Sequence, residues 1–223
     1  MPLALRSLLL AGSTGLVGRA LLAQALAGPD LQAVHLLLRR AGAAPAADVR
    51  VRPLVVDFAA LPALPAADAA LCALGTTIKV AGSQAAFRAV DHDAVLAFAR
   101  AARDAGVSRF GLVSALGADA RSRVFYNRVK GEAEDAVRAL GFATLVIARP
   151  SLLLGDRQAL GQPPRRGERL GQHLAAPLAP LLPAAWRPIG ADAVARALLR
   201  ALAGAGAGVQ VLESARLHEL GAP

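Results

Sequence analysis

The sequence predicts a doubly wound α/β fold, in which helices cover both faces of a mostly parallel sheet. Two observations lead to this expectation. Short apolar runs alternate with longer segments of helical periodicity along most of the 223 residues. Ala, Leu and Val must fill the core, because 55% of the residues are hydrophobic but only 4% are aromatic. This length suits one well-filled core, so we expect a single domain over residues 1–223.

Seven apolar runs are expected to form strands. They span residues 5–11, 33–38, 51–56, 69–73, 109–113, 144–148 and 209–212. Pro53 lies in the third run, although a proline lacks the N–H that a central strand needs. The third strand of a doubly wound sheet lies at an edge, where that N–H is dispensable. Pro53 therefore agrees with this topology.

Four helices are expected between these strands, at residues 16–27, 84–105, 124–140 and 192–203. Gly106 and Gly141 follow two of them directly, where a left-handed residue commonly ends a helix. The alternation fails at residues 152–189, because Gly, Pro and Arg dominate 155–171 and a proline-broken apolar stretch follows. We expect this segment to form a small C-terminal substrate lobe or lid.

Several features bear on location. Every apolar stretch is shorter than the roughly 18–20 residues that span a bilayer, so we expect a soluble protein without a membrane partner. The first apolar run precedes glycines and is interpreted as a strand rather than an export signal. Cys72 is the single cysteine, which rules out an intrachain disulfide. A cytoplasmic location is expected.

The net charge of +9 raises the possibility of nucleic-acid binding. However, the arginines are scattered through the chain, and the lysines are limited to Lys79 and Lys130. This distribution does not predict a nucleic-acid surface. The four histidines have no paired ligand spacing, so no metal site is expected either.

The segment from Leu8 to Gly18 is typical of a Rossmann-like dinucleotide site, because an apolar strand leads through glycines into a helix. Gly12 permits the sharp turn, Gly15 lets a diphosphate approach the backbone, and Gly18 lets the helix pack on the strand. The free N–H groups at the helix start then face the phosphates. A plain strand-to-helix turn is the alternative. The expected cofactor contacts here are Gly12, Ser13, Thr14, Gly15, Leu16 and Val17.

The end of the second strand bears on the choice of cofactor. An acidic residue there would bind the adenosine ribose of NAD, but the chain has Arg39 and Arg40. Their guanidinium groups suit a 2′-phosphate, which favours NADP(H) over NAD(H). The alternative is that both are ordinary surface arginines.

Three polar residues are candidates for catalysis. Tyr126 is the only tyrosine, and Lys130 follows it by one helical turn, so both lie on one helix face. A nearby ammonium favours the ionised phenol and makes it a better proton carrier. Ser114 follows the fifth strand, at the sheet edge where such folds bind ligands. Alternatively, Phe125 and Tyr126 are core aromatics, Lys130 a solvated charge and Ser114 a cap.

These residues resemble the atypical short-chain dehydrogenases/reductases, especially small NAD(P)H-binding members akin to the Tat-interacting-protein oxidoreductases. The resemblance covers nearly the whole chain. Besides the glycines and Ser114, it rests on Leu74-Gly75-Thr76-Thr77, Gly117-Ala118, Tyr126-Asn127-Arg128-Val129-Lys130-Gly131-Glu132 and Arg149-Pro150-Ser151.

The resemblance implies a catalytic set of Ser114, Tyr126 and Lys130. It also implies that Asp57 lies near the adenine, and that the cofactor cleft is lined by Leu74, Gly75, Thr76, Pro150 and Ser151. We therefore expect an NADPH-dependent oxidoreductase acting on a carbonyl or alcohol of a small, fairly apolar substrate. The alternatives are an NADPH-binding regulatory or interaction protein with little turnover and, less favoured, an epimerase or dehydratase.

Two further expectations concern contacts. Arg149 is the nearest candidate to bind an anionic group of the substrate. The long helices after the fourth and fifth strands could pair across a two-fold axis, so the chain is expected to be a monomer or a homodimer.

Overall fold

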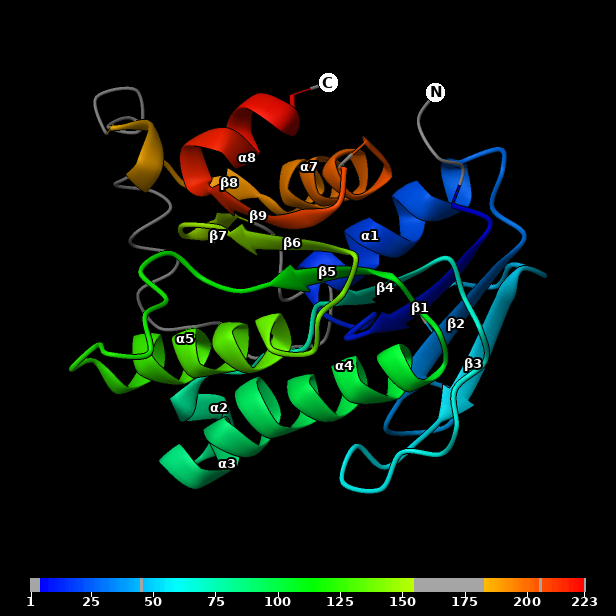
Figure 1. Ribbon diagram of the computed structural model, residues 1–223, viewed down its shortest axis with the longest axis horizontal. Coiled ribbons are helices and arrows are strands. Elements are labelled where there is room, and N and C mark those ends of the chain that lie inside the picture. The colour runs from blue at the N-terminus through cyan, green and yellow to red at the C-terminus, as the bar shows by residue number, and fades with distance from the viewer. Residues whose placement is uncertain (1–4, 45, 155–182, 205, 223) are drawn as a thin grey trace.

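A parallel sheet with helices on both faces forms the centre of the protein in the computed structural model, which describes residues 5–44, 46–154, 183–204 and 206–222 (Figure 1). Within these ranges the main sheet has seven strands in the order β3-β2-β1-β4-β5-β6-β9, and all neighbours run parallel. The strands are β1 (Ser7–Ala11), β2 (Ala33–Leu38), β3 (Val51–Val55), β4 (Ala69–Cys72), β5 (Arg109–Val113), β6 (Thr144–Arg149) and β9 (Gly208–Glu213).

All seven expected strands are therefore confirmed, and so is the doubly wound order. β3 lies at the edge, where Pro53 stands opposite Leu36 of β2. The N–H that Pro53 lacks has no further strand to face. Gly106 and Gly141 have the expected left-handed φ angles of 84° and 68°.

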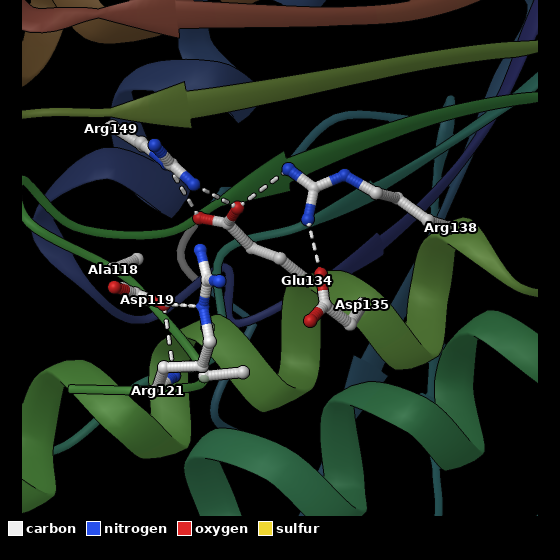
Figure 2. Close-up of a pocket in the computed structure, with 9 residues that line it drawn as sticks. Ala118, Asp119, Arg121, Glu134, Asp135, Arg138 and Arg149 are labelled. Atoms are coloured by element: carbon white, nitrogen blue, oxygen red, sulfur yellow. Dashed lines mark hydrogen bonds and ion pairs between the residues drawn. The ribbon is translucent and has the colours of Figure 1, made fainter.

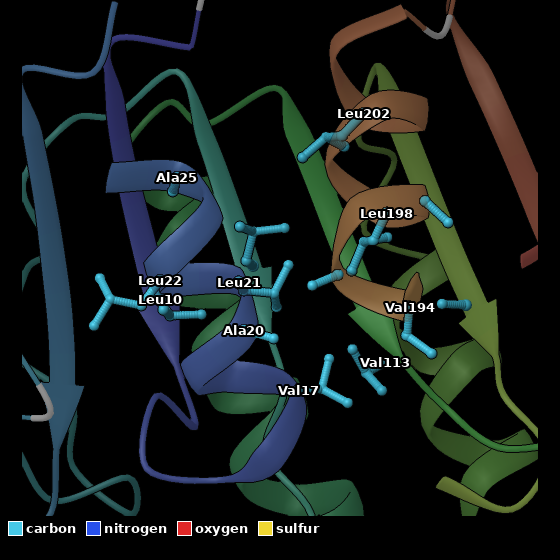
Figure 3. Packing of buried hydrophobic residues seen from close by; sticks show 14 of the residues in the cluster. Leu10, Val17, Ala20, Leu21, Leu22, Ala25, Val113, Val194, Leu198 and Leu202 are labelled. Atoms are coloured by element: carbon cyan, nitrogen blue, oxygen red, sulfur yellow. The ribbon is translucent and has the colours of Figure 1, made fainter. Parts of the chain in front are cut away.

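Two apolar clusters hold the helices against the sheet. Helix α1 (Leu16–Ala27) and helix α7 (Ala191–Gly204) pack on one face, and helix α4 (Ala94–Asp104) and helix α5 (Phe125–Arg138) pack on the other (Figure 1). Alternation along β1 separates the clusters, because Leu8 and Leu10 belong to the first and Leu9 to the second. Figure 3 shows Leu21 of α1 and Leu198 of α7 in the first cluster.

The expected helix at 84–105 is divided into three parts. Helix α3 (Gln84–Arg88) is followed by a π-helical segment, η1 (Ala89–Asp93), before α4 begins. The apolar periodicity continues across this segment, so it did not reveal the wider turn. The sequence also gave no sign of α2 (Ile78–Ala81), α8 (Ser214–Leu220), the 3₁₀ turn η3 (Ala184–Trp186), or the short strands β7 (Leu153–Leu154) and β8 (Ile189–Gly190).

The expected lobe at 152–189 is only partly visible, since residues 155–182 lie outside the described residues. Its two ends are joined, because β7 pairs in parallel with β8. No helix within the described ranges combines the length and apolar character needed to cross a membrane.

Candidate active site

The glycine turn between β1 and α1 is shaped by two close approaches. Gly12 has φ 87°, and a Cβ there would lie 2.4 Å from the backbone of Ala73. A Cβ on Gly18 would lie 2.0 Å from the oxygen of Gly12. These two glycines are therefore required by the packing of the turn itself.

Gly15 is different, because its absent side chain leaves open space. A Cβ there would come no closer than 3.5 Å to the oxygen of Gly12. No side chain caps the start of α1, and its first turn holds no acidic residue. The hydroxyl of Ser13 is buried and has no hydrogen-bond partner among the described residues. An uncapped helix start beside an unpaired hydroxyl fits a diphosphate group.

The ends of β2 and β3 lie side by side, because the N–H of Val56 donates to the oxygen of Leu38 at 2.8 Å. The exposed Arg39 and Arg40 follow directly. The exposed Asp57 follows Val56, and its carboxylate accepts the N–H of Ala59 at 2.9 Å. Both candidate contacts for the adenosine half of a cofactor thus lie at the carboxyl edge of the sheet.

The three candidate catalytic residues come from β5 and α5. Ser114 follows β5 and is 7% exposed, and its hydroxyl is without a hydrogen-bond partner in the part of the chain that is described. Lys130 is 6% exposed. The half-buried ring of Tyr126 packs 5.4 Å from that of Phe87 in α3. Lys130 is therefore no solvated surface charge, and the Ser114 side chain forms no helix cap.

One site residue was missed by the sequence analysis. Asp91, in η1, is 1% exposed, and its Oδ1 lies 2.7 Å from Nζ of Lys130. Its Oδ2 accepts the backbone N–H of Thr76 at 2.8 Å. A signal was available, because Asp91 shares the apolar helical face of Phe87 and Val95. A carboxylate in such a position needs a buried partner.

The charges around Lys130 determine its protonation. Burial lowers the pKa of the ammonium by desolvation, but Asp91 and Tyr126 attract it and outweigh that effect. The pKa of Lys130 is therefore raised above its ordinary value, and the side chain is a cation at neutral pH. Nearby, burial raises the pKa of the Cys72 thiol to about 12, which makes it unreactive.

The loops after β4, β5 and β6 meet beside these residues. The N–H of Leu116 donates to the oxygen of Pro150 at 2.9 Å, which joins the second loop to the third. The hydroxyl of Ser151 donates to the oxygen of Arg187. In the first loop, Leu74 packs against the second apolar cluster, and a Cβ on Gly75 would lie 3.7 Å from Nζ of Lys130. The structure thus brings the Gly75 loop to Lys130.

Arg149 does not have the role expected for it. Its guanidinium makes two hydrogen bonds with Glu134, at 2.9 and 2.7 Å, and one with Glu213 at 2.8 Å. The hydrogen bonds to Glu134 are the main reason why the pKa of Arg149 is raised. The side chain connects α5, β6 and β9, and its charge is balanced by two carboxylates, which use three of its five N–H donors. The expectation of an anionic substrate contact is therefore wrong.

A hollow of about 500 Å³ lies between α5 and the loop after β5 (Figure 2). Its charged side chains pair with one another, as Arg138 does with Glu134 and Asp135. None of the three candidate catalytic residues lines it. It is lined by Ala118, Asp119, Ala120, Arg121, Gly131, Glu134, Asp135, Arg138 and Arg149. This hollow is therefore distinct from the candidate active site.

Comparisons with known proteins bear on the same segments. The NAD(P)H-binding family matches residues 12–173. Protein HTATIP2 of Rattus norvegicus is 35% identical over 225 residues, which cover 97% of this chain and 89% of that protein. Protein fmp52, mitochondrial, of Emericella nidulans is 37% identical over 159 residues, or 67% of each chain.

Among solved structures, an oxidoreductase of the short-chain dehydrogenase/reductase family from Burkholderia thailandensis is similar to this chain. The TM-score is 0.71 at 19% sequence identity, and the match covers 96% of this chain and 93% of that one. At this identity the similarity concerns the fold.

Proposed function

Because the chain belongs to the NAD(P)H-binding, atypical short-chain dehydrogenases/reductases, we propose that it is an NADPH-dependent oxidoreductase for a carbonyl or alcohol of a small, fairly apolar substrate. One observation carries the proposal. The Ser114 hydroxyl, which has no partner within the described residues, lies at the sheet edge where the Gly75 loop lies, together with the phenol of Tyr126 and the buried cation of Lys130. Open α/β sheets bind their ligands at this edge.

The turn from Gly12 to Val17 would hold the diphosphate, with Ser13 donating from its hydroxyl. Leu74, Gly75, Thr76, Pro150 and Ser151 would border the remainder of the cofactor, and Asp57 would lie near the adenine. The bound cofactor supplies hydride transfer between its nicotinamide and the substrate carbon.

The side chains of this protein handle the oxygen and its proton. Ser114 donates a hydrogen bond to the carbonyl oxygen and fixes its position. Tyr126 gives its proton to that oxygen in reduction and removes it in oxidation. The ammonium of Lys130 stabilises the phenolate that remains after reduction and holds the ribose.

The test of the mechanism is Tyr126→Phe, since Tyr126 is the only tyrosine. This change removes the proton donor but keeps the ring that packs on Phe87. We expect NADPH consumption across a panel of aldehydes and ketones to fall to background, while the Kd for NADPH by calorimetry stays within about twofold. Unchanged turnover would refute the mechanism. Failure of the wild-type protein to bind either NADPH or NADH would refute the function.

The preference for NADPH depends on Arg39 and Arg40, which are exposed beside the end of β3. The variant Arg39→Ala/Arg40→Ala should raise the Kd for NADPH at least about tenfold, because each charge-assisted hydrogen bond contributes about 1.5 kcal/mol or more. The Kd for NADH should not change. Arg52→Ala, on the exposed edge strand, is the control and should change neither. Equal or tighter binding of NADH by the wild-type protein would contradict the preference.

A cytoplasmic location also belongs to this proposal. The fungal relative is named as mitochondrial, so location needs its own test. Fractionation of the native cells should recover the protein with the soluble enzymes. Recovery with an organelle or a membrane would contradict this part of the proposal.

A further inference from the structure

Asp91 is a carboxylate placed inside the apolar core. It is 1% exposed, and its neighbours on the helical face, Phe87 and Val95, are equally buried. A buried carboxylate without partners would cost several kcal/mol, so its contacts must offset this cost. The residue also lies in η1, the π-helical turn that interrupts the helical segment. Such turns occur frequently at functional sites.

The two oxygens of Asp91 join separate parts of the chain. Oδ1 pairs with Nζ of Lys130 at 2.7 Å, and Oδ2 accepts the N–H of Thr76 at 2.8 Å. One carboxylate therefore links η1, α5 and the loop after β4. Gly75 packs against this ion pair, since a Cβ there would lie 3.4 Å from Oδ1 of Asp91 and 3.7 Å from Nζ of Lys130.

We propose that Asp91 is a positioning residue, which fixes the ammonium of Lys130 relative to the Thr76 backbone so that the catalytic lysine and the cofactor loop form one rigid unit. This inference rests on the proposed function, because Lys130 is its catalytic cation. Asp91 itself contacts neither substrate nor cofactor in this scheme. It acts through Lys130.

The groups around Lys130 fix the direction of the expected effect. The titratable groups that face it are Asp91 from η1, Tyr126 from its own helix and Cys72 from β4. Asp91→Asn removes a negative charge but keeps an oxygen that can accept the Thr76 N–H. Without that charge, the protonated form of Lys130 is less favoured. The pKa of Lys130 must then fall.

The direct measurement is ¹³C NMR of protein labelled at the lysine Cε. The chain has two lysines, so the exposed Lys79 serves as an internal reference for Lys130. In the wild-type protein we expect Lys130 to titrate above the ordinary pKa of a lysine side chain. In Asp91→Asn the Lys130 midpoint should move down by roughly one pH unit or more, while that of Lys79 stays in place.

Asp93→Asn is the matched control. Asp93 lies in the same π-helical segment, but its side chain is 61% exposed and pairs with His92. This variant should leave the Lys130 titration unchanged. A Lys130 midpoint that does not move in Asp91→Asn would overturn the proposal. If that variant does not fold, the wild-type titration decides, because a Lys130 midpoint at or below the ordinary pKa of a lysine side chain would also overturn the proposal.

Activity provides a second readout that a merely structural residue would not change. The basic limb of the pH profile for carbonyl reduction should move to lower pH in Asp91→Asn, in step with the Lys130 midpoint, and stay in place in Asp93→Asn. If kcat fell in Asp91→Asn but the basic limb of the pH profile stayed at the same pH, the proposal would be contradicted. The NMR titration needs no turnover. Loss of the Asp91–Lys130 coupling can therefore be distinguished from failure of the proposed oxidoreductase function.

Discussion

Ser114 and Ser214 offer a comparison of two buried hydroxyls. Both side chains are buried, and neither hydroxyl has a partner in the described part of the chain. Ser114 follows β5 at the candidate site, whereas Ser214 begins α8. A buried hydroxyl that makes no hydrogen bond adds little stability. An unsatisfied hydroxyl in a binding cleft is instead available to a ligand.

We therefore predict that Ser114→Ala lowers kcat for carbonyl reduction about 100-fold, the usual effect of losing one donor to a reacting oxygen. The free energy of unfolding should change by less than about 1 kcal/mol, because the Ser114 hydroxyl makes no hydrogen bond within the described part of the chain. Steady-state kinetics and urea denaturation check the two halves of this prediction. Ser214→Ala should leave both quantities in place, and an equal loss of kcat in both variants would contradict a specific role for Ser114.

The catalytic candidates differ in how far the sequence could reveal them. Tyr126 and Lys130 are four residues apart in one helix, so the helical period alone places them on one face. Ser114 follows an apolar run, which places it at a strand end. Asp91 reaches Lys130 from another helix through a tertiary contact. Helical spacing predicts contacts within an element, and it contains no information about a pair of this kind.

At the scale of elements, α5 connects the candidate site to the sheet. Tyr126, Lys130 and Glu134 follow one another at intervals of four residues, so they share one side of the helix. Further along the helix, Gly131 and Glu134 line the hollow of Figure 2. A Cβ on Gly131 would lie 2.1 Å from the backbone nitrogen of Ala120. This glycine allows the loop after β5 to lie directly on α5.

Glu134 secures the same helix to the sheet. It is fully buried and pairs with Arg138 of its own helix and Arg149 of β6. Glu134→Ala would leave the guanidinium of Arg149 without its two-point partner, so we predict a loss of about 3–5 kcal/mol in the free energy of unfolding. Asp135→Ala is the control, since Asp135 is exposed and pairs with Arg138 on the surface of the same helix. Asp135→Ala should lower the free energy of unfolding by less than about 1 kcal/mol.

Urea denaturation with a constant m-value measures both losses. Similar urea midpoints for Glu134→Ala and Asp135→Ala would show that the buried network contributes no more to the free energy of unfolding than a surface ion pair does. Because α5 also positions Tyr126, a destabilised Glu134→Ala protein should lose turnover at temperatures where Asp135→Ala retains it.

The elements themselves were largely predictable because the pattern is repetitive. Each strand of the main sheet is a short apolar run between turn residues, and the period changes to that of a helix after it. The π-helical turn at 89–93 was missed because one extra residue in a turn leaves the apolar face continuous. The two-residue strands β7 and β8 are too short to produce an alternating pattern. They pair only because the ends of the 152–189 segment meet.

At the scale of the whole molecule, cofactor binding and folding are thermodynamically linked. A ligand that binds only the folded protein stabilises it by about 2.7 kcal/mol when present at 100 times its Kd. For a chain of this length, that corresponds to a rise in Tm of roughly 5–10 °C. We expect NADPH to produce this shift in a thermal denaturation measurement.

Gly15→Ala separates the binding contribution from the packing contribution. The added methyl group would make only an ordinary contact, 3.5 Å from the oxygen of Gly12, so the Tm without cofactor should change by no more than about 3 °C. The same methyl group would occupy the space before α1 that the diphosphate needs. The Tm rise with NADPH should therefore be lost or greatly reduced, and calorimetry should show affinity at least about tenfold weaker.

Gly204→Ala is the control for this last prediction. Gly204 ends α7, and a Cβ there would meet nothing within 4 Å. The Tm of the Gly204→Ala protein without cofactor should equal or exceed that of the wild-type protein, because alanine is favoured over glycine in a helix. The full rise with NADPH should remain. If Gly15→Ala also kept the full rise, the diphosphate could not lie against the start of α1, and the cofactor site would have to be sought elsewhere on the sheet edge.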